Sequence, residues 1–135
     1  MAAKIERGVA RLIDANLNRA REGLRVVEDT ARFIWSDAAA YRRLRRIRHE
    51  LHDLTKGAYR ALVAARDSAA DSGRTVVEGS KRTLSGVVSA NLRRAQEAVR
   101  VLEEYSKVFA GRSAAGFKAI RFRLYQEEKR ILKKL

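Results

Sequence analysis

The sequence predicts an all-α protein, and more specifically a four-helix bundle built from two repeated antiparallel helical hairpins. Three observations lead to this fold class. The 135 residues contain no proline, and the strong helix formers Ala, Leu, Arg, Glu and Lys dominate the composition. Apolar residues recur at the three- and four-residue spacing that is typical of a helix with one buried side. Finally, a helical segment of the first half returns in the second half.

The repeated segment covers residues 13–34 and returns at residues 88–109, with nine of 22 aligned positions identical. A duplicated hydrophobic core would repeat only apolar side chains, whereas polar side chains are repeated here as well. Polar groups beside a buried stripe need hydrogen-bond partners, so we expect another helix or a bound ligand to contact them. The identical polar pairs are Asn16/Asn91, Arg19/Arg94, Glu22/Glu97, Arg25/Arg100 and Glu28/Glu103.

The first hairpin is predicted from about residue 3 to residue 65. Its first helix should run from about Ala3 to Trp35, and Ser36 or Asp37 can cap the next helix. The second helix is marked by an unbroken apolar stripe at helical spacing, so we expect a single helix as far as Ala65. That stripe consists of Leu44, Ile47, Leu51, Leu54, Ala58, Leu62 and Ala65.

The second hairpin is predicted from about residue 84 to residue 135, after a connecting loop at residues 66–83. The loop contains two glycines and several small polar residues without a helical stripe. Long loops in a compact domain are often functional. A third helix is expected from about Ser85 to Ala110, Ser113 can cap the fourth, and residues 1–135 are treated as a single domain.

The composition excludes several classes of protein. There is no cysteine for disulfides or thiolate metal sites, and no apolar run is long enough to span a membrane. We therefore expect a soluble, cytoplasmic protein without a membrane partner. The net charge is +14, with arginine as the main basic residue, which favours an anionic partner such as nucleic acid or a phosphorylated small molecule.

The repeated Asn and Arg residues are the best candidates for a binding site. The amides of Asn16 and Asn91 both donate and accept hydrogen bonds, which suits the edge of a pyrimidine ring. Arg19 and Arg94 lie about one turn further on and can hold a phosphate. An equally good interpretation is structural, because such residues can fix the register of two hairpins. The sequence contains no phosphate-binding glycine loop and no dinucleotide fingerprint.

Carboxylates form a second set of candidates. Glu28, Glu103 and Glu104 could hold Mg²⁺, a hard cation that prefers carboxylate and water oxygens, and Asp67 or Asp71 of the loop could join them. Taken singly, each carboxylate is better explained by an ion pair with one of the many arginines. Taken together, arginines, a small acidic cluster and a loop that can close are the parts that phosphoryl transfer needs.

Four segments together suggest a family: residues 11–29, 66–67, 71–73 and 90–105. They resemble the small helical hydroxymethylpyrimidine phosphate kinases of thiamine biosynthesis, which are unrelated to the ribokinase-like enzyme and occur alone or fused to thiamine phosphate synthase. The resemblance covers nearly the whole chain. It implies phosphorylation of 4-amino-2-methyl-5-(phosphooxymethyl)pyrimidine by ATP and a functional association with thiamine phosphate synthase. Mg²⁺ is expected beside ATP as a cofactor, because phosphoryl transfer needs a metal to neutralise charge.

The resemblance and the chemistry of the side chains give each candidate an expected role. The expected catalytic residues, which would neutralise phosphate charge, are Arg19, Arg66 and Arg94. The expected substrate-binding residues are Asn16, Arg25, Glu28, Asn91 and Glu103. The expected metal ligands are Glu28, Glu103 and Glu104, and the loop residues expected to close over the site are Asp67, Asp71 and Gly73.

Two other functions are compatible with the sequence. A nucleic-acid-binding helical module explains the charge and the basic run from Arg42 to Arg48, and it predicts binding that weakens steeply with salt. It does not explain why Glu28 and Glu103 are repeated together with Asn and Arg. A helical assembly domain, in which the repeat only builds a homodimer, predicts no nucleotide binding.

Overall fold

The computed structural model describes residues 6–76, 79, 82–109 and 114–135. These residues form helices, turns and loops without any strand, which confirms the predicted all-α class. A π-helical turn, η1 (Thr30–Ile34), extends the first long helix. The long helices are α1 (Arg7–Asp29), α2 (Ala38–Thr55), α4 (Leu84–Phe109) and α5 (Ala114–Leu132).

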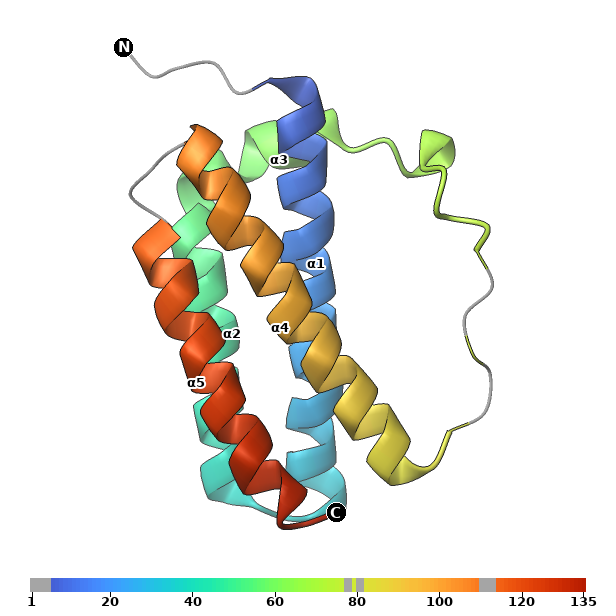
Figure 1. Ribbon diagram of the computed structural model, residues 1–135, viewed down its shortest axis with the longest axis vertical. Helices are drawn as coiled ribbons and strands as arrows, with labels where there is room; N and C mark the ends of the chain where they lie inside the picture. The colour runs from blue at the N-terminus through green and yellow to red at the C-terminus, as the bar shows by residue number, and fades with distance from the viewer. Residues whose placement is uncertain (1–5, 77–78, 80–81, 110–113) are drawn as a thin grey trace.

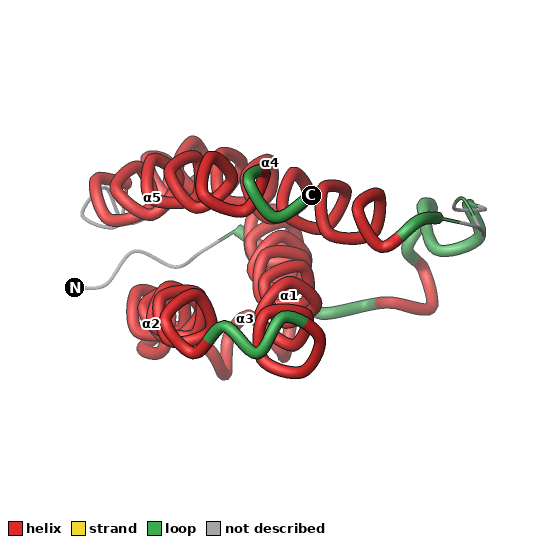
Figure 2. The backbone as a smooth tube through the Cα atoms, turned by 90° about the horizontal axis from the view of Figure 1, so that it is seen from below, coloured by secondary structure: helices red, strands yellow, loops and turns green. Residues whose placement is uncertain are grey.

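Each long helix packs against two of the others. α1 contacts α2 and α4, and α5 contacts α4 and α2. In Figure 1, α1 and α5 run downward while α2 and α4 run upward, so neighbouring helices are antiparallel. Figure 2 looks along the bundle and shows α4 and α5 lying above α1 and α2. The equivalence of the two halves as repeated hairpins stays a prediction from the sequence.

The core is formed by apolar side chains on the inward-facing sides of the four long helices. Burial of these side chains removes apolar surface from water and is the main driving force for folding. None of the described helices is long and apolar enough to cross a membrane. The buried stripe residues include Ile13, Leu17, Leu24, Val27, Leu44, Ile47, Leu51, Leu92, Val99, Leu102, Ile120 and Leu124.

The second helix differs from the prediction, because it is not continuous as far as Ala65. α2 ends at Thr55, a 3-10 turn η2 (Lys56–Ala58) follows, and α3 (Tyr59–Ala65) completes the segment. Glycine is a poor helix former because it loses more backbone entropy than other residues, and Gly57 lies in the turn. Leu62 of α3 is still buried, so the apolar stripe continues across the break and conceals it.

The other predicted boundaries lie close to the observed ones. The connection at residues 66–83 contains one 3-10 turn, η3 (Ser68–Ala70), among its described residues. The predicted first residues of the first helix, the predicted cap Ser113 and parts of the loop lie outside the described residues. These undescribed positions are residues 1–5, 77–78, 80–81 and 110–113.

The predicted cap of α2 is confirmed at Asp37, whose carboxylate accepts a hydrogen bond from the backbone N–H of Ala40 at 3.0 Å. This bond and the hydrogen bond with Lys134 lower the pKa of Asp37. A lowered pKa in the folded state means that the carboxylate stabilises the fold above its unfolded pKa. That contribution is lost as the pH falls through the folded-state pKa.

We therefore expect Asp37→Ala to lower the free energy of unfolding by about 1 kcal/mol at pH 7. The difference from wild type should begin to shrink as the pH falls below the ordinary aspartate pKa of about 4, because the unfolded chain then binds a proton more readily than the capped carboxylate. Urea unfolding over a series of pH values from 7 downward measures both effects. Asp53→Ala is the control, since Asp53 lies exposed on the same helix. An equal loss in the control would mean that the cap is not the cause.

Candidate functional site

A pocket between α1 and α4 brings together three of the residues predicted from the sequence. It has a volume of about 340 Å³ and combines one amide, two guanidinium groups, one carboxylate and a small apolar surface. Asn91, the predicted partner of Asn16, does not line it. The lining residues are Asn16, Arg19, Arg94, Glu97, Ala98 and Val101. We call this the Asn16 pocket.

Both repeated asparagines are anchored within their own helices. Asn16 Nδ2 donates to the carbonyl of Leu12 at 2.9 Å, and its Oδ1 accepts from Arg19 at 3.5 Å. Asn91 Nδ2 donates to the carbonyl of Val87 at 2.8 Å. An asparagine amide has two N–H donors and two lone pairs, so Asn16 keeps one of each for a ligand. The local bonds hold the amide in place without using up its capacity.

α1 and α4 approach each other closely at Gly23. A Cβ atom built on this residue would lie 2.7 Å from the carbonyl oxygen of Asn91. Only glycine fits such a contact, since side-chain carbon and backbone oxygen cannot approach to that distance. The contact also shows why Asn91 lies outside the Asn16 pocket: its backbone is packed against α1.

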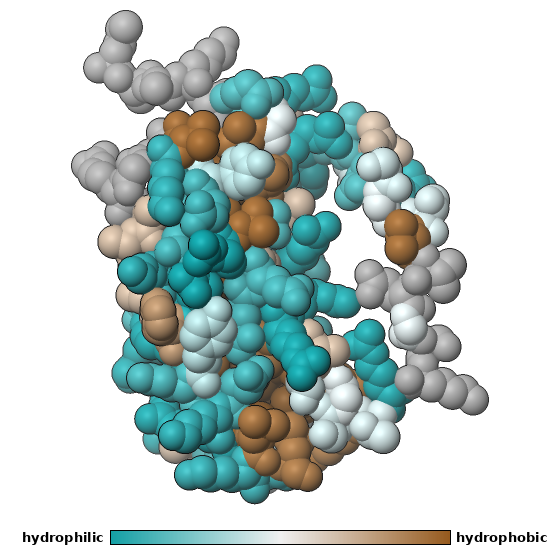
Figure 3. All heavy atoms as spheres, viewed as in Figure 1, coloured by the Kyte–Doolittle hydropathy of each residue, from teal (hydrophilic) through white to brown (hydrophobic). Residues whose placement is uncertain are grey.

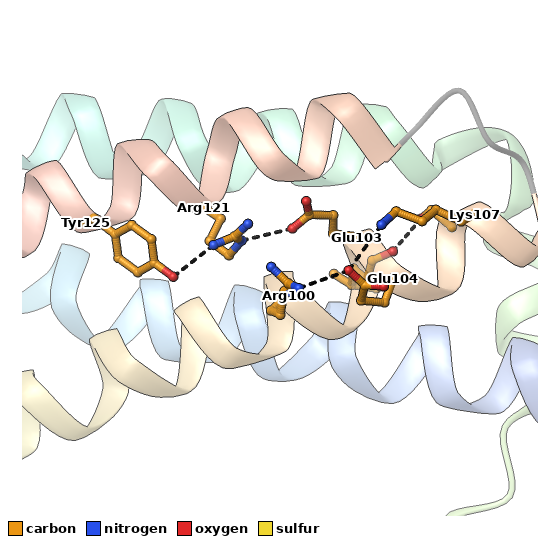
Figure 4. Close-up of polar contacts among 8 residues, drawn as sticks. Arg100, Glu103, Glu104, Lys107, Arg121 and Tyr125 are labelled. Carbon is orange, nitrogen blue, oxygen red and sulfur yellow. Dashed lines mark hydrogen bonds and ion pairs between the residues drawn. The ribbon is translucent and has the colours of Figure 1, made fainter.

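The repeated glutamates lie in two separate buried ion pairs. Glu28 is fully buried, and its carboxylate accepts from Arg48 Nε at 2.7 Å and from Arg48 Nη2 at 3.0 Å. Glu103 accepts from Arg121 Nε at 2.9 Å, and Figure 4 shows Arg121 pointing toward this carboxylate. The hydrogen bonds with these glutamates raise the pKa of both guanidinium groups. One pair joins α1 to α2, and the other joins α4 to α5.

These pairs change the interpretation of the carboxylates as metal ligands. Glu104, next to Glu103, is engaged by Arg100 and Lys107, both at 3.2 Å (Figure 4). Within the described part of the chain, no group of three His, Cys, Asp or Glu residues could hold a metal ion. Glu28 and Glu103 belong to different helix pairs, and each faces an arginine. Arg48 and Arg121, which complete the pairs, were not among the predicted site residues.

The loop residues gather on a different side of α1. Arg66, which follows α3, donates to Asp14 through Nε at 2.7 Å and through Nη2 at 2.8 Å. Asp14 is buried, and its hydrogen bonds raise the pKa of Arg66. This pair fixes the start of the connection against α1. A pocket of about 360 Å³ lies beside it and is lined by Asp67 and Asp71 as well. Sequence reasoning missed Asp14.

The remaining predicted residues occupy the ends of this region. Gly73 donates its backbone N–H to Asp71 Oδ1 at 2.8 Å, so it forms a turn next to the loop pocket. Arg25 lines another pocket, of about 350 Å³, together with Asn18, Arg21, Glu22 and Arg48. The structure thus distributes the predicted site over both flanks of α1 rather than in one cavity.

The fold and these pockets define an all-helical protein whose arginine-lined surface suits anionic small ligands. Residues 11–130 match the ThiD2 family, and the chain belongs to that family. No solved structure matches the chain.

Several curated proteins are similar in sequence to this chain. A protein of Rhodopirellula baltica is 42% identical over 123 residues, one of Nostoc punctiforme 37% over 132 residues, and one of Synechococcus sp. strain CC9605 45% over 123 residues. Each is named thiamine-phosphate synthase. The matches cover 88%, 96% and 89% of this chain but only 33%, 37% and 34% of the relatives. The comparisons place the chain in the context of thiamine biosynthesis, and the chain spans about a third of the length of these relatives.

Proposed function

We propose that the chain transfers the γ-phosphoryl group of ATP to 4-amino-2-methyl-5-(phosphooxymethyl)pyrimidine and forms the diphosphate and ADP. The observation that carries this proposal is the Asn16 pocket. An amide with one free donor and one free acceptor suits the aminopyrimidine ring, and two arginines suit its phosphate. The chain belongs to a family of thiamine biosynthesis, which supports the choice of a pyrimidine phosphate over other anions.

The chemistry places modest demands on the protein. The acceptor oxygen belongs to a phosphate that already carries negative charge at neutral pH, so no strong general base is needed. A lone pair of this oxygen attacks the γ-phosphorus, the bond from the γ-phosphorus to the bridging oxygen breaks, and ADP leaves with that electron pair. Arg19 and Arg94 would neutralise the charge that otherwise keeps the two phosphates apart. The acceptor phosphate thus supplies both binding energy and the nucleophile.

Mg²⁺ fits this site only in part. The carboxylates predicted as ligands are held by arginines, and Glu28 has both oxygens occupied by Arg48. Mg²⁺ is often bound through substrate phosphates with few protein ligands. We therefore expect the metal to accompany the triphosphate of ATP instead of residing in a site built from Glu28, Glu103 and Glu104.

The decisive experiment measures ADP formation from ATP and Mg²⁺ with the pyrimidine monophosphate as acceptor, beside the unphosphorylated alcohol. We expect turnover with the monophosphate only. Arg19→Ala should lower turnover about 100-fold or more, because an electrostatic contact to the transferring group is lost. Arg93→Ala is the matched control, since Arg93 precedes Arg94 on α4 but does not line the Asn16 pocket.

A folded wild-type protein without turnover would refute the proposal. If that protein also bound RNA with steep salt dependence, the nucleic-acid alternative would take its place. Equal losses in Arg19→Ala and Arg93→Ala would show that general positive charge matters, and not the Asn16 pocket.

A further inference from the structure

A second polar groove runs along the flank of α1 opposite the Asn16 pocket. It consists of the loop pocket and the pocket at Arg25, which share Asn18 as a lining residue. The first is lined partly by residues 66–71 and the second partly by Arg48 of α2. We call the two together the α1 trench. Its arginines and its shared amide are Arg11, Asn18, Arg21, Arg25, Arg48 and Arg66.

Two side chains of the trench have no partner among the described residues. Arg21 Nε is buried and makes no hydrogen bond. The side chain of Asn18 likewise makes no hydrogen bond within the described part of the chain. Buried polar groups are nearly always hydrogen-bonded. Leaving a buried charged donor without a partner costs more free energy than leaving a neutral one. A bound anion would satisfy Arg21.

Other arginines of the trench are held in fixed positions. Arg66 donates two hydrogen bonds to Asp14, and Arg48 donates two to Glu28. A guanidinium has five N–H donors, so each of these side chains keeps donors for a ligand after binding its carboxylate. Arginines that are already oriented lose little entropy when they bind phosphate. The ion pairs thus prepare the trench for an anion.

The two repeats differ at the residues that distinguish the trench. At the positions of Asn18 and Arg21, the second repeat has Arg93 and Gln96, and Gln96 donates to Glu128 at 3.1 Å. A groove between α4 and the end of α5 is lined mainly by apolar residues, and Figure 3 shows hydrophobic residues near the end of α5. Its apolar lining residues are Val88, Leu92, Ile131, Leu132 and Leu135. Asn18 and Arg21 are therefore not part of the repeated polar pattern.

We infer that the α1 trench binds a nucleoside triphosphate, with the phosphates at the Arg21 end and the nucleoside at the Asp67 end. The inference rests on the proposed function, which leaves the donor nucleotide without a site. The Arg21 end holds three arginines and one lining carboxylate, a balance that suits a polyphosphate. The other end holds Asp67 and Asp71, whose carboxylates can accept hydrogen bonds from sugar hydroxyls.

The position of the trench also fits a donor site. Asn18, which belongs to both of its parts, is adjacent in sequence to Arg19 of the Asn16 pocket. The two sites therefore flank the same turn of α1 on different sides. Because the body of the helix separates the two sites, a triphosphate in the trench would reach an acceptor in the Asn16 pocket around the exposed face of this turn, past Arg19.

The test measures the binding of two ligands to the full chain by isothermal titration calorimetry. The ligands are the β,γ-imido analogue of ATP with Mg²⁺, and the pyrimidine monophosphate. Arg21→Ala should weaken binding of the ATP analogue about 10- to 100-fold, because a charge-assisted contact is lost, and should leave binding of the monophosphate unchanged. Arg19→Ala should show the opposite pattern. Arg93→Ala should change neither affinity.

Arg21→Ala is a favourable variant because its Nε has no partner to lose, so the urea midpoint should not fall. Wild-type affinity for the ATP analogue in this variant, or a loss confined to the monophosphate, would overturn the inference. Asn18→Ala gives a second test and should follow Arg21→Ala. Arg21-dependent binding of the ATP analogue without any turnover would refute the proposed function while the trench assignment stands.

Discussion

Replacing Glu28 by Ala is expected to lower the free energy of unfolding by about 3–5 kcal/mol. Glu28 has no exposed surface, and Arg48 is only 15% exposed, so the substitution leaves a guanidinium charge in the interior without its counterion. Arg25, at 3.9 Å from Glu28, is too exposed and too distant to contribute much. The loss is large because the remaining charge is desolvated, and not because the pair itself is strongly stabilising.

The matched control is Glu104→Ala. Glu104 also pairs with basic side chains, but it is 43% exposed, so water replaces its partners and no measurable loss is expected. Urea unfolding followed by circular dichroism measures both variants. Similar losses would show that burial of Glu28 is not the cause.

A double variant, Glu28→Met with Arg48→Met, separates structure from catalysis. Removing both charges should recover most of the stability, because neither is left unpaired. If the recovered protein keeps its turnover, Glu28 is a structural residue. If it is folded but inactive, Glu28 or Arg48 acts in ligand binding or catalysis, because Arg48 also lines the α1 trench.

The sequence was sufficient to predict the helices, because a helix with one buried side carries apolar residues at a regular spacing of three or four. Leu44, Ile47 and Leu51 repeat at helical spacing and are all buried. The interruption of the helix at Gly57 could not be predicted from this spacing, because the apolar residues that follow η2 still face the core. An apolar stripe predicts which side of a segment is buried. It does not predict whether each turn of that segment is α-helical or 3-10.

The ion pairs were harder to predict than the helices. Glu28 and Arg48 are 20 residues apart, and Asp14 and Arg66 are 52 residues apart, so no local pattern links them. A signal for the first pair was nevertheless present. Arg48 has a counterpart at Arg121 in the second half, just as Glu28 has one at Glu103. A buried acid that repeats together with a base on the next helix indicates a pair within each half.

The candidate site was predicted in parts. Helical periodicity placed Asn16 and Arg19 on the same flank of α1, and both line one pocket. The prediction that Asn91 joins them assumed that the two halves are equal. They differ at one critical position, because the first repeat has Gly23 where the second has Ala98. This difference lets the backbone of Asn91 pack against α1, so the second asparagine has a different environment.

Gly23→Ala is accordingly expected to destabilise the protein, although alanine is the better helix former. The intrinsic preference would stabilise α1 by about 1 kcal/mol. Against this gain, a Cβ atom at 2.7 Å from the Asn91 carbonyl must push α4 away from α1. Overpacking costs about 1–3 kcal/mol, and the upper end applies because the obstacle is backbone in a long helix. The net loss should be about 2 kcal/mol.

The same substitution should impair the Asn16 pocket, because α1 supplies Arg19 and α4 supplies Ala98. We expect weaker binding of the pyrimidine monophosphate at temperatures where the variant is fully folded. Gly57→Ala is the control, since nothing lies within 4 Å of the added Cβ, and it should be neutral or slightly stabilising. A Gly23→Ala protein as stable as wild type would mean that the helices can separate freely at this point. Unchanged ligand affinity in a destabilised variant would show that the pocket does not depend on the close contact of α1 and α4.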